Sequence, residues 1–317
     1  MNILVVDKLD ERALKDLQTA GFEITLAKGL SVDFLPKEAP ECAILIVRST
    51  MVTAAIMAKL PSLKLIIRAG AGVDTIDIAA AAKHGIQVSN CPGKNADAVA
   101  EMALALLLAV DRKVAEGTIA LRQGRWNKGA LGQAMGLKGR VLGIVGLGAV
   151  GKALVQKAKG LQMDVIAWSR SLTPESAKIA GVRYAASLAE LAKAVDAVSI
   201  HVASIKETRN LIGPAFFAAL KPDVIFVNTA RGEVVDRTAM LEAIRSRGLR
   251  VGLDVFTGEP KVSEALFADT ELAAFVVGTP HLGASTDQAL EAVAFEVVRI
   301  AKVFQETGQA PNAVAPA

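Results

Sequence analysis

The stretch that decides the fold is Val141-Leu-Gly-Ile-Val-Gly-Leu-Gly-Ala-Val-Gly151. A short apolar run is followed at once by a glycine turn and then by the amphipathic segment Ala149–Lys159. A strand, a glycine turn and a helix in this order are the context in which Gly-x-Gly-x-x-Gly binds a dinucleotide. Gly146 would permit the tight turn, Gly148 the approach of the pyrophosphate, and Gly151 the close packing of helix on strand.

The start of this helix is the expected phosphate site. Its first N–H groups have no partner within the helix, and the positive end of the helix dipole favours an anion there. We therefore expect Ala149 and Val150 to contact the cofactor together with the three glycines.

On both sides of the motif, short apolar runs alternate with helix-length amphipathic segments, which is typical of parallel α/β architecture. The expected strands are Ile3–Val6, Ile24–Leu26, Ala43–Val47, Leu65–Arg68, Gln87–Ser89, Val141–Val145, Asp164–Trp168, Ala197–Ile200, Val224–Asn228, Val251–Asp254 and Phe275–Val277. The expected helices include Glu11–Ala20, Thr53–Lys59, Ala96–Ala115 and Ser285–Gln305. From Gly117 to Gly139 the chain is polar and Gly-rich without periodicity, which predicts a long functional or interfacial loop. The tail from Gly308 is expected to be irregular.

The length of 317 residues exceeds what one hydrophobic core usually supports, so we expect two domains. Hydrophobic residues make up 52% of the chain and charged residues 21%, as in ordinary globular proteins. The net charge of +4 is spread along the sequence, which favours solvated faces over a nucleic-acid surface.

Neither a membrane segment nor a metal site is expected. The most apolar stretch, Ala98–Val110, contains Glu101 and is too short to cross a bilayer. The N-terminus reads as a first strand rather than as a signal peptide. Cys42 and Cys91 lie in apolar surroundings without metal-ligand spacing, which predicts buried free thiols and a reducing, cytoplasmic compartment.

The residues after the second strand of this series bear on the choice of cofactor. NAD-selective domains carry an acidic residue there, which binds the ribose 2′-hydroxyl. This chain has Ser169 followed by Arg170, and the arginine could pair with a 2′-phosphate or could simply point to solvent. We expect NAD or NADP as cofactor, with NADP at least tolerated.

Three further motifs each follow or end an expected strand of the same sheet, at Asn228–Asp236, Gly252–Pro260 and Gly278–Thr286. Because ligands gather at the carboxyl ends of parallel strands, Arg231, Glu259 and His281 could meet there. Oxidation of an alcohol needs a base such as His, a carboxylate that orients it, and an Arg that binds a substrate carboxylate.

Each of these residues also has a structural explanation. Arg231 could form an ion pair, Glu259 could belong to a turn, and His281 could cap a strand end. Their combination beside a dinucleotide motif favours the catalytic interpretation.

With these motifs the sequence resembles the D-isomer-specific 2-hydroxyacid dehydrogenases over essentially its full length. The resemblance implies hydride transfer between a nicotinamide cofactor and a D-2-hydroxy acid, with Arg231, Glu259 and His281 as catalytic residues. It implies that Asp254 holds the nicotinamide carboxamide. Further cofactor-lining positions are Val202, Thr229, Ala230, Gly283 and Ala284.

The family also implies two Rossmann-like, doubly wound parallel-sheet domains with a cleft between them. Residues 1–95 and 286–317 would form a discontinuous catalytic and substrate-binding domain, and 96–285 the dinucleotide-binding domain. The long helix and the arm 117–136 resemble the family's dimer interface, so we expect a homodimer or a higher homo-oligomer. The chain departs from the family at Ser169 and at Ala203, where His201-Val-Ala stands for the usual His-x-Pro. We take His201 as structural.

An arginine ends each of two apolar strands of the first part, at Arg48 and Arg68. Two such arginines suit a substrate with an anionic group beyond its carboxylate, such as a phosphate. The N–H groups of Gly70, Ala71 and Gly72 could bind a carboxylate.

Together with Asn90–Asn95 and Pro311–Val314, these segments resemble the phosphoglycerate dehydrogenase branch of the family, in a short form. That resemblance implies D-3-phosphoglycerate and 3-phosphohydroxypyruvate as substrates, a step of serine biosynthesis, with Asn95 among the substrate contacts. The alternatives are a glyoxylate or hydroxypyruvate reductase, in which the two arginines only cap strands or pair with acids, and a non-catalytic NAD-binding regulator.

Overall fold

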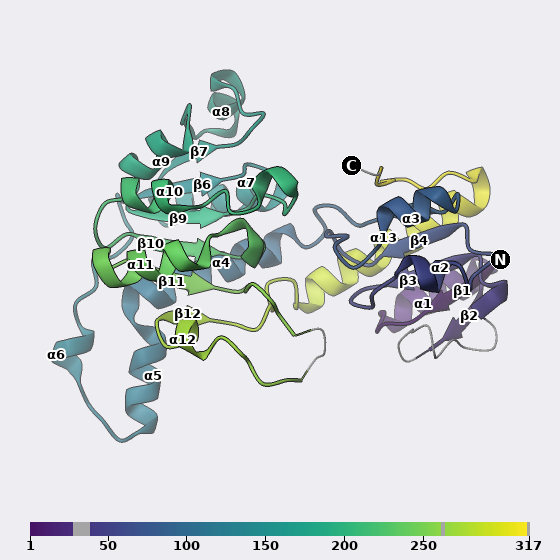
Figure 1. Cartoon of the computed structure of the whole chain (residues 1–317), viewed down its shortest axis with the longest axis horizontal. Helices are drawn as coiled ribbons and strands as arrows, with labels where there is room; N and C mark the ends of the chain where they lie inside the picture. Colours follow the sequence, from purple (N-terminus) through teal and green to yellow (C-terminus); the bar gives the residue numbers. More distant parts are fainter. Residues whose placement is uncertain (28–38, 261–263, 316–317) are drawn as a thin grey trace. The chain divides into compact units, whose positions relative to one another are not determined.

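The computed structural model describes residues 1–27, 39–260 and 264–315 of the chain. The chain divides into two compact units, one formed by 1–95 with 285–317 and the other by 96–284. Each unit is built around its own parallel sheet (Figure 1). The first unit therefore combines two segments that are far apart in the sequence.

The first unit contains a five-stranded sheet in the order β2-β1-β3-β4-β5. Its strands are β1 (Asn2–Val5), β2 (Glu23–Leu26), β3 (Ile44–Val47), β4 (Leu65–Arg68) and β5 (Gln87–Ser89). Its helices are α1 (Glu11–Thr19), α2 (Ala54–Met57), α3 (Ile78–Lys83) and α13 (Asp287–Thr307). Helices α1 and α13 bury one face of the sheet, and α2 and α3 bury the other.

The second unit contains a seven-stranded sheet in the order β12-β11-β10-β9-β6-β7-β8. Its strands are β6 (Val141–Val145), β7 (Asp164–Trp168), β8 (Arg183–Tyr184), β9 (Ala197–Ile200), β10 (Ile225–Asn228), β11 (Arg250–Leu253) and β12 (Val276–Gly278). Its helices are α4 (Ala96–Arg112), α5 (Val114–Arg122), α6 (Lys128–Leu131), α7 (Ala149–Gly160), α8 (Pro174–Ala180), α9 (Leu188–Ala194), α10 (Pro214–Ala219), α11 (Arg237–Arg247) and α12 (Thr270–Ala273). The strand order reverses between β6 and β9, which is where open α/β sheets bind their ligands.

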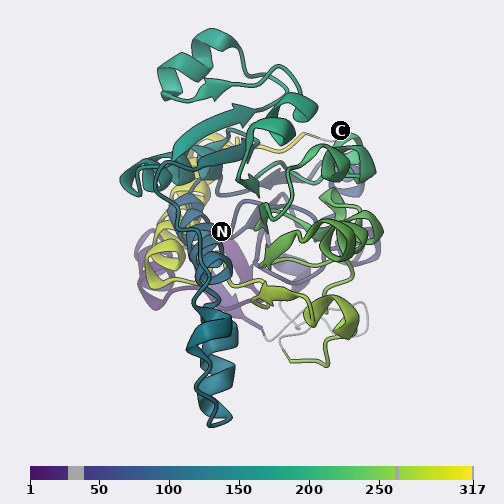
Figure 2. The ribbon, with the colours of Figure 1, turned by 90° about the vertical axis from the view of Figure 1, so that its left-hand side faces the viewer.

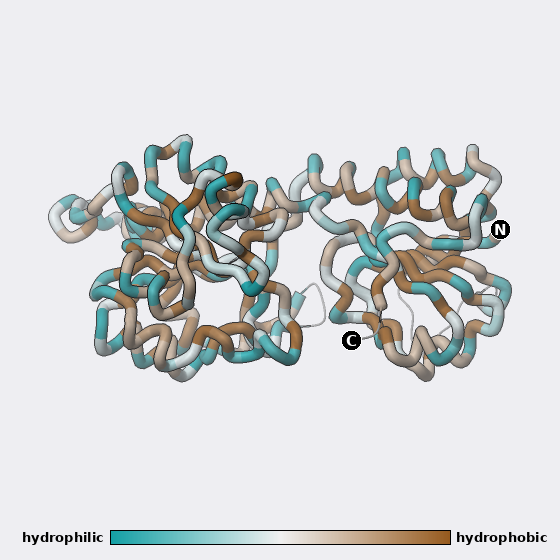
Figure 3. The backbone as a smooth tube through the Cα atoms, turned by 90° about the horizontal axis from the view of Figure 1, so that it is seen from above, coloured by the Kyte–Doolittle hydropathy of each residue, from teal (hydrophilic) through white to brown (hydrophobic). Residues whose placement is uncertain are grey.

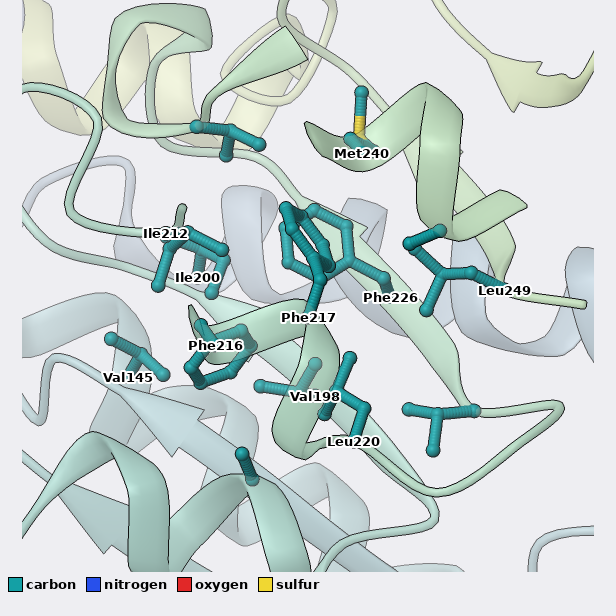
Figure 4. Close-up of a cluster of buried hydrophobic side chains, with 14 of the residues drawn as sticks. Val145, Val198, Ile200, Ile212, Phe216, Phe217, Leu220, Phe226, Met240 and Leu249 are labelled. Carbon is teal, nitrogen blue, oxygen red and sulfur yellow. The ribbon is translucent and has the colours of Figure 1, made fainter. Parts of the chain in front are cut away.

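Hydrophobic side chains fill both faces of each sheet, and in Figure 3 the brown segments gather on the strands and on the inner faces of helices. In the second unit, α4, α7 and α8 cover one face, and α9, α10 and α11 cover the other. Phe216, Phe217 and Phe226 pack together on the latter face (Figure 4), with neighbouring ring centroids 6.1 and 5.5 Å apart. Burial of this kind fixes the sheet that carries the candidate site.

The parallel α/β class predicted from the sequence is confirmed. Five of the predicted strands have the observed bounds, and the other six differ by one residue at one end or at both ends. The two-residue strand β8 was missed, because Arg183–Tyr184 is too short to show alternation.

The predicted helix over 96–115 and the predicted loop over 117–139 are wrong in part. Helix α4 ends at Arg112, because Lys113 adopts a left-handed conformation with φ of 50°, and α5 then continues to Arg122. Gly117 lies within α5, where its cost of roughly 1 kcal/mol relative to Ala is tolerated among good helix formers.

Helices α5 and α6 form an arm that projects from the sheet of the second unit; α5 points downward in Figure 2. Asp111 fixes the segment that leads from the arm back to β6. Its buried carboxylate accepts hydrogen bonds from Arg140 Nη1 at 3.1 Å and from the Gly136 N–H at 3.0 Å. Across the described ranges, no helix has the length and apolar character needed to span a membrane.

Candidate active site

A histidine and a glutamate meet at the carboxyl end of the second sheet. Glu259 lies in the loop after β11 and His281 in the turn after β12, and Oε2 of Glu259 is 2.6 Å from Nδ1 of His281. The other carboxylate oxygen accepts the N–H of Phe256 at 2.8 Å. Both side chains are partly open to solvent, with 29% of the glutamate and 44% of the histidine exposed. The imidazole is thus oriented through one nitrogen while the other is available for a proton.

The surroundings keep Glu259 ionised. Partial burial alone would raise its pKa, but the hydrogen bonds from His281 and the Phe256 N–H, with the positive charge of Arg231, bring the pKa below its usual value. The carboxylate therefore stays charged at neutral pH, where it can accept a hydrogen bond from Nδ1 of His281.

The backbone of His281 is itself constrained. Its φ of 54° is unusual for a residue with a side chain, and its N–H donates to the carbonyl of Asp254 at 2.8 Å. The buried Asp254 carboxylate accepts hydrogen bonds from Thr279 Oγ1, and from the N–H groups of Leu282 and Gly283, at 2.7 to 2.8 Å. Asp254 therefore holds the turn that carries the histidine.

Arg231 follows β10, the strand next to β11, and lies near enough to Glu259 to lower the pKa of that carboxyl. The next residue, Gly232, packs against the backbone of Phe256 and Thr257, and a Cβ there would overlap both. This close approach brings the loop of Arg231 against the loop of Glu259. The structure thus brings together all three residues that the sequence singled out.

The glycine motif lies at the switch point of the same sheet. Gly146 has φ of 100° and its turn passes so close to His201 and Val202 that a Cβ would collide with their backbone. Gly151 likewise leaves no room for a side chain, because the helix lies against the carbonyl of Gly146. Gly148 is the N-cap of α7 and faces open space. This cradle, with free N–H groups at the start of α7, fits the pyrophosphate of a dinucleotide.

The remaining predicted cofactor residues also lie at carboxyl ends of strands. They are Ala149 and Val150 at the start of α7, Ser169 and Arg170 after β7, Val202 after β9, Thr229 and Ala230 after β10, Asp254 after β11, and Gly283 and Ala284 after β12. Ser169 is half-buried and Arg170 is exposed.

His201 lies inside the second unit beside this turn. Burial lowers its pKa to about 4, and its Nε2 has no hydrogen-bond partner among the described residues. The part-buried ring is neutral at physiological pH, and its structural role stays a prediction.

In the first unit, Arg48 and Arg68 occupy the ends of neighbouring strands β3 and β4. Within the described ranges, the half-buried guanidinium of Arg48 has no acidic partner. The guanidinium of Arg68 lies over Gly70, where a Cβ would overlap Nη1. Asn95 is half-buried and is the last residue before α4.

Asp7, which sequence reasoning missed, fixes the turn after β3. Its carboxylate accepts the N–H groups of Arg48, Ser49 and Thr50 at 2.6 to 3.0 Å, and the Thr50 hydroxyl. Burial would raise the pKa of Asp7, but these hydrogen bonds lower it below its usual value. Its place directly after the first strand of a parallel sheet was the signal that could have revealed it.

Both cysteines are free and buried, which confirms the predicted thiols. Burial raises the pKa of Cys42 to about 11 and that of Cys91 to about 12, so neither forms a reactive thiolate at neutral pH. Among the residues that the structure describes, no three His, Cys, Asp or Glu side chains gather in a way that could hold a metal ion.

Comparison with known proteins identifies the family. Residues 104–283 match the model of the D-isomer specific 2-hydroxyacid dehydrogenase NAD binding domain. The chain belongs to this family of NAD(P)-dependent oxidoreductases. It is 37% identical over 294 residues, 92% of its length, to D-3-phosphoglycerate dehydrogenase of Methanocaldococcus jannaschii, of which it covers 55%.

Other relatives carry different names. The chain is 39% identical over 306 residues to hydroxypyruvate reductase of Thermotoga maritima, covering 96% of this chain and 97% of that one. Its fold matches the NADPH-dependent glyoxylate/hydroxypyruvate reductase of Sinorhizobium meliloti, solved with NADP and malonate, at a TM-score of 0.84 and 27% identity, covering 99% of this chain and 96% of that one. The chain spans about half the length of the phosphoglycerate dehydrogenases it matches.

Proposed function

We propose that the chain transfers hydride between NAD(P) and a D-2-hydroxy acid, with D-3-phosphoglycerate and 3-phosphohydroxypyruvate as the substrate pair. The 2.6 Å contact between His281 and Glu259, beside Arg231 and on the sheet that bears the glycine cradle, carries this proposal. Residues 1–95 with 286–317 supply the substrate-binding domain, and 96–285 the dinucleotide-binding domain.

The residues divide the chemistry among them. In the direction of oxidation, Nε2 of His281 takes the hydroxyl proton while the hydrogen on the same carbon leaves with its electron pair, so that a carbonyl forms. A dinucleotide held at the glycine cradle of Gly146, Gly148 and Gly151 would supply the hydride acceptor. Glu259 holds Nδ1 and stabilises the resulting imidazolium, and Arg231 binds the substrate carboxylate and polarises the oxygen at the reacting carbon.

Two features of the first unit support a phosphorylated substrate. Arg48 has no acidic partner among the residues described, so its charge is available to an anion. Of the predicted loop donors, the N–H of Gly70 already donates to the carbonyl of Arg68 at 2.8 Å. The N–H groups of Ala71, Gly72 and Val73 have no acceptor in the described ranges, and they can bind a carboxylate. Arg68 and Asn95 complete the proposed contacts of the substrate.

The experiment compares 3-phosphohydroxypyruvate, hydroxypyruvate and glyoxylate, each with NADH and with NADPH, by the loss of absorbance of the reduced cofactor. We expect the highest kcat/KM for the phosphorylated acid. Arg48→Gln should lower that value roughly 10- to 100-fold and leave hydroxypyruvate unchanged, because a hydrogen bond to a charged group contributes about 1.5–3 kcal/mol. A preference for an unphosphorylated acid would reject this substrate.

Hydroxypyruvate or glyoxylate is the second candidate, favoured by the hydroxypyruvate reductase that matches this chain over 97% of its own length.

The base is tested separately. His281→Ala should reduce turnover about 10²- to 10⁴-fold with little change in dinucleotide affinity. Undiminished turnover would reject the base, and a wild-type chain that binds dinucleotide yet turns over no oxo acid would indicate a non-catalytic regulator.

The choice of cofactor is tested at Arg170. If its guanidinium binds the 2′-phosphate, Arg170→Ala should lower the affinity for NADPH and leave the affinity for NADH unchanged.

A further inference from the structure

Residues 308–314, near the end of the chain, extend the first sheet. Ala313 forms an antiparallel bridge with Ser89 of β5, and the N–H of Val314 donates to the carbonyl of Val88 at 2.8 Å. The amide of Gln87 binds the same segment twice, to the Gly308 carbonyl and to the Ala310 N–H, each at 2.8 Å. The segment, yellow in Figure 1, therefore occupies the free edge of β5.

Asn312 is the polar centre of this segment. Its φ of 57° is left-handed, and its side-chain amide donates to Oε1 of Glu296 at 2.8 Å and to the carbonyl of Asn90 at 3.2 Å. Glu296, on α13, is 6% exposed and pairs with Arg299 at 2.6 Å and with Lys94 at 3.4 Å. These partners, Arg299 foremost, lower the pKa of Glu296 to about 2, so a permanent charge fixes the amide of Asn312.

The contact continues from Asn90 into the proposed substrate loop. Nδ2 of Asn90 donates to the carbonyl of Ala71 at 2.6 Å, and the N–H of Cys91 donates to the carbonyl of Gly70 at 2.9 Å. The carbonyls of Gly70 and Ala71 are therefore held toward residues 90–91. The N–H groups of Ala71, Gly72 and Val73, which find no acceptor among the described residues, are left to an anion.

We propose that Asn312 and Asn90 are positioning residues for substrate binding. They form a path of hydrogen bonds from Glu296 through Asn312 and Asn90 to Ala71, and the path fixes the direction in which the loop amides point. Because a hydrogen bond to an anion depends steeply on donor direction, loss of the path weakens the affinity for the anionic substrate. This inference rests on the proposed function, in which the loop 70–73 binds the substrate.

The first test measures KM and kcat for Asn312→Gly and Asn90→Ala with the best oxo acid found for the wild type. Glycine accepts the left-handed backbone at position 312, so only the amide is lost. We expect KM for the oxo acid to rise at least tenfold in each variant. Turnover at saturation and KM for the reduced dinucleotide should change less than twofold. Gln309→Ala, in the same segment, is the matched control and should behave as the wild type.

The double variant Asn90→Ala/Asn312→Gly asks whether the two residues act through one path. If they do, its KM equals that of the more affected single variant, whereas independent effects would multiply. An unchanged KM in both single variants overturns the inference, as does a fall in kcat that matches the rise in KM for both substrates, since that marks general damage to the fold.

Hydrogen exchange separates this inference from the proposed function. In Asn312→Gly, the peptide covering 69–74 should exchange faster, while peptides of the second unit keep the wild-type rate. If the wild-type chain reduces no oxo acid, the proposed function fails, and unchanged exchange at 69–74 then rejects the path as well. If the wild type is active and exchange and KM stay unchanged in the variants, only the path is rejected.

Discussion

The carboxylate at position 259 accepts two hydrogen bonds, one from His281 at 2.6 Å and one from the backbone of Phe256 at 2.8 Å. Glu259→Gln keeps the shape and removes the negative charge that holds Nδ1 of His281. We expect reduction of the oxo acid at neutral pH to fall about 100-fold.

The measurement is kcat in both directions at neutral pH, with Glu233→Gln, on the neighbouring loop, as the control. A kcat of Glu259→Gln equal to that of the wild type would show that the charge has no role.

Gly232 supports the same pair through backbone geometry. A side chain at this position would force apart the loops of Arg231 and Glu259, since a Cβ overlaps the backbone of Phe256 and Thr257. A displacement of about 1 Å in a catalytic group can cost roughly 100-fold in rate, so Gly232→Ala should lower kcat by about that factor. Gly160→Ala, at the open end of α7, is the control. Wild-type kcat in Gly232→Ala would contradict this account.

The residues of the candidate triad could be predicted because each lies in a loop that follows a strand, and strand ends converge in a parallel sheet. The residues that hold them could not. The close approach at Gly232, the bonds from Thr279 to Asp254, and the amide of Asn312 depend on which loops become neighbours in space. Only Asp7 and Gly232 left a local signal, a strand-end acid and a glycine beside a motif arginine.

At the scale of elements, the strands could be predicted almost to the residue, because buried parallel strands are short apolar runs bounded by turns. The helix within the arm could not be predicted, since α5 packs little apolar surface against the sheet and so lacks the periodic face that marks a helix. The break at Lys113 is invisible in the sequence, because a left-handed lysine has no characteristic pattern.

The arm α5–α6 exposes several large apolar side chains, among them Ile119 at 51%, Leu121 at 61% and Trp126 at 83%. We propose that a second copy of the chain covers it, as the family resemblance implies. Trp126→Glu with Ile119→Glu should raise the dimer dissociation constant at least 100-fold, because two charges would enter an apolar interface.

Light scattering over a dilution series measures this change, and Ile179→Glu, exposed elsewhere on the second unit, is the control. A dimer of unchanged affinity would place the interface on another surface.

For the whole molecule, the part-buried His201, whose Nε2 is enclosed, predicts a loss of stability in mild acid. Its pKa in the folded chain is about 4 against an ordinary 6.5, so only the unfolded chain takes up its proton between these values. The contribution of His201 to the free energy of unfolding is fully present above pH 6.5. It is lost as the pH drops to 4, by up to roughly 3 kcal/mol. Denaturant unfolding of the second unit, followed by the fluorescence of Trp126 and Trp168, should show this slope, and His201→Leu should remove it.

Below pH 4 the carboxylates determine how stability changes with pH. Three of them, Asp7, Glu259 and Glu296, have pKa values below the ordinary ones. The stability that they contribute is fully present above the ordinary pKa and is lost as the pH falls through the lowered pKa. A slope between pH 6.5 and 4 that survives in His201→Leu would assign it to other groups.

The turn at Asp7 limits the number of dinucleotides that one chain can bind. The first sheet has the strand order of flavodoxin-like folds, which bind a nucleotide where the order reverses, here between β1 and β3. The amides that would bind a phosphate at that point already bind the carboxylate of the chain itself. Two sheets of related topology therefore offer one dinucleotide site per polypeptide, and the stoichiometry of NAD(P) binding should be one.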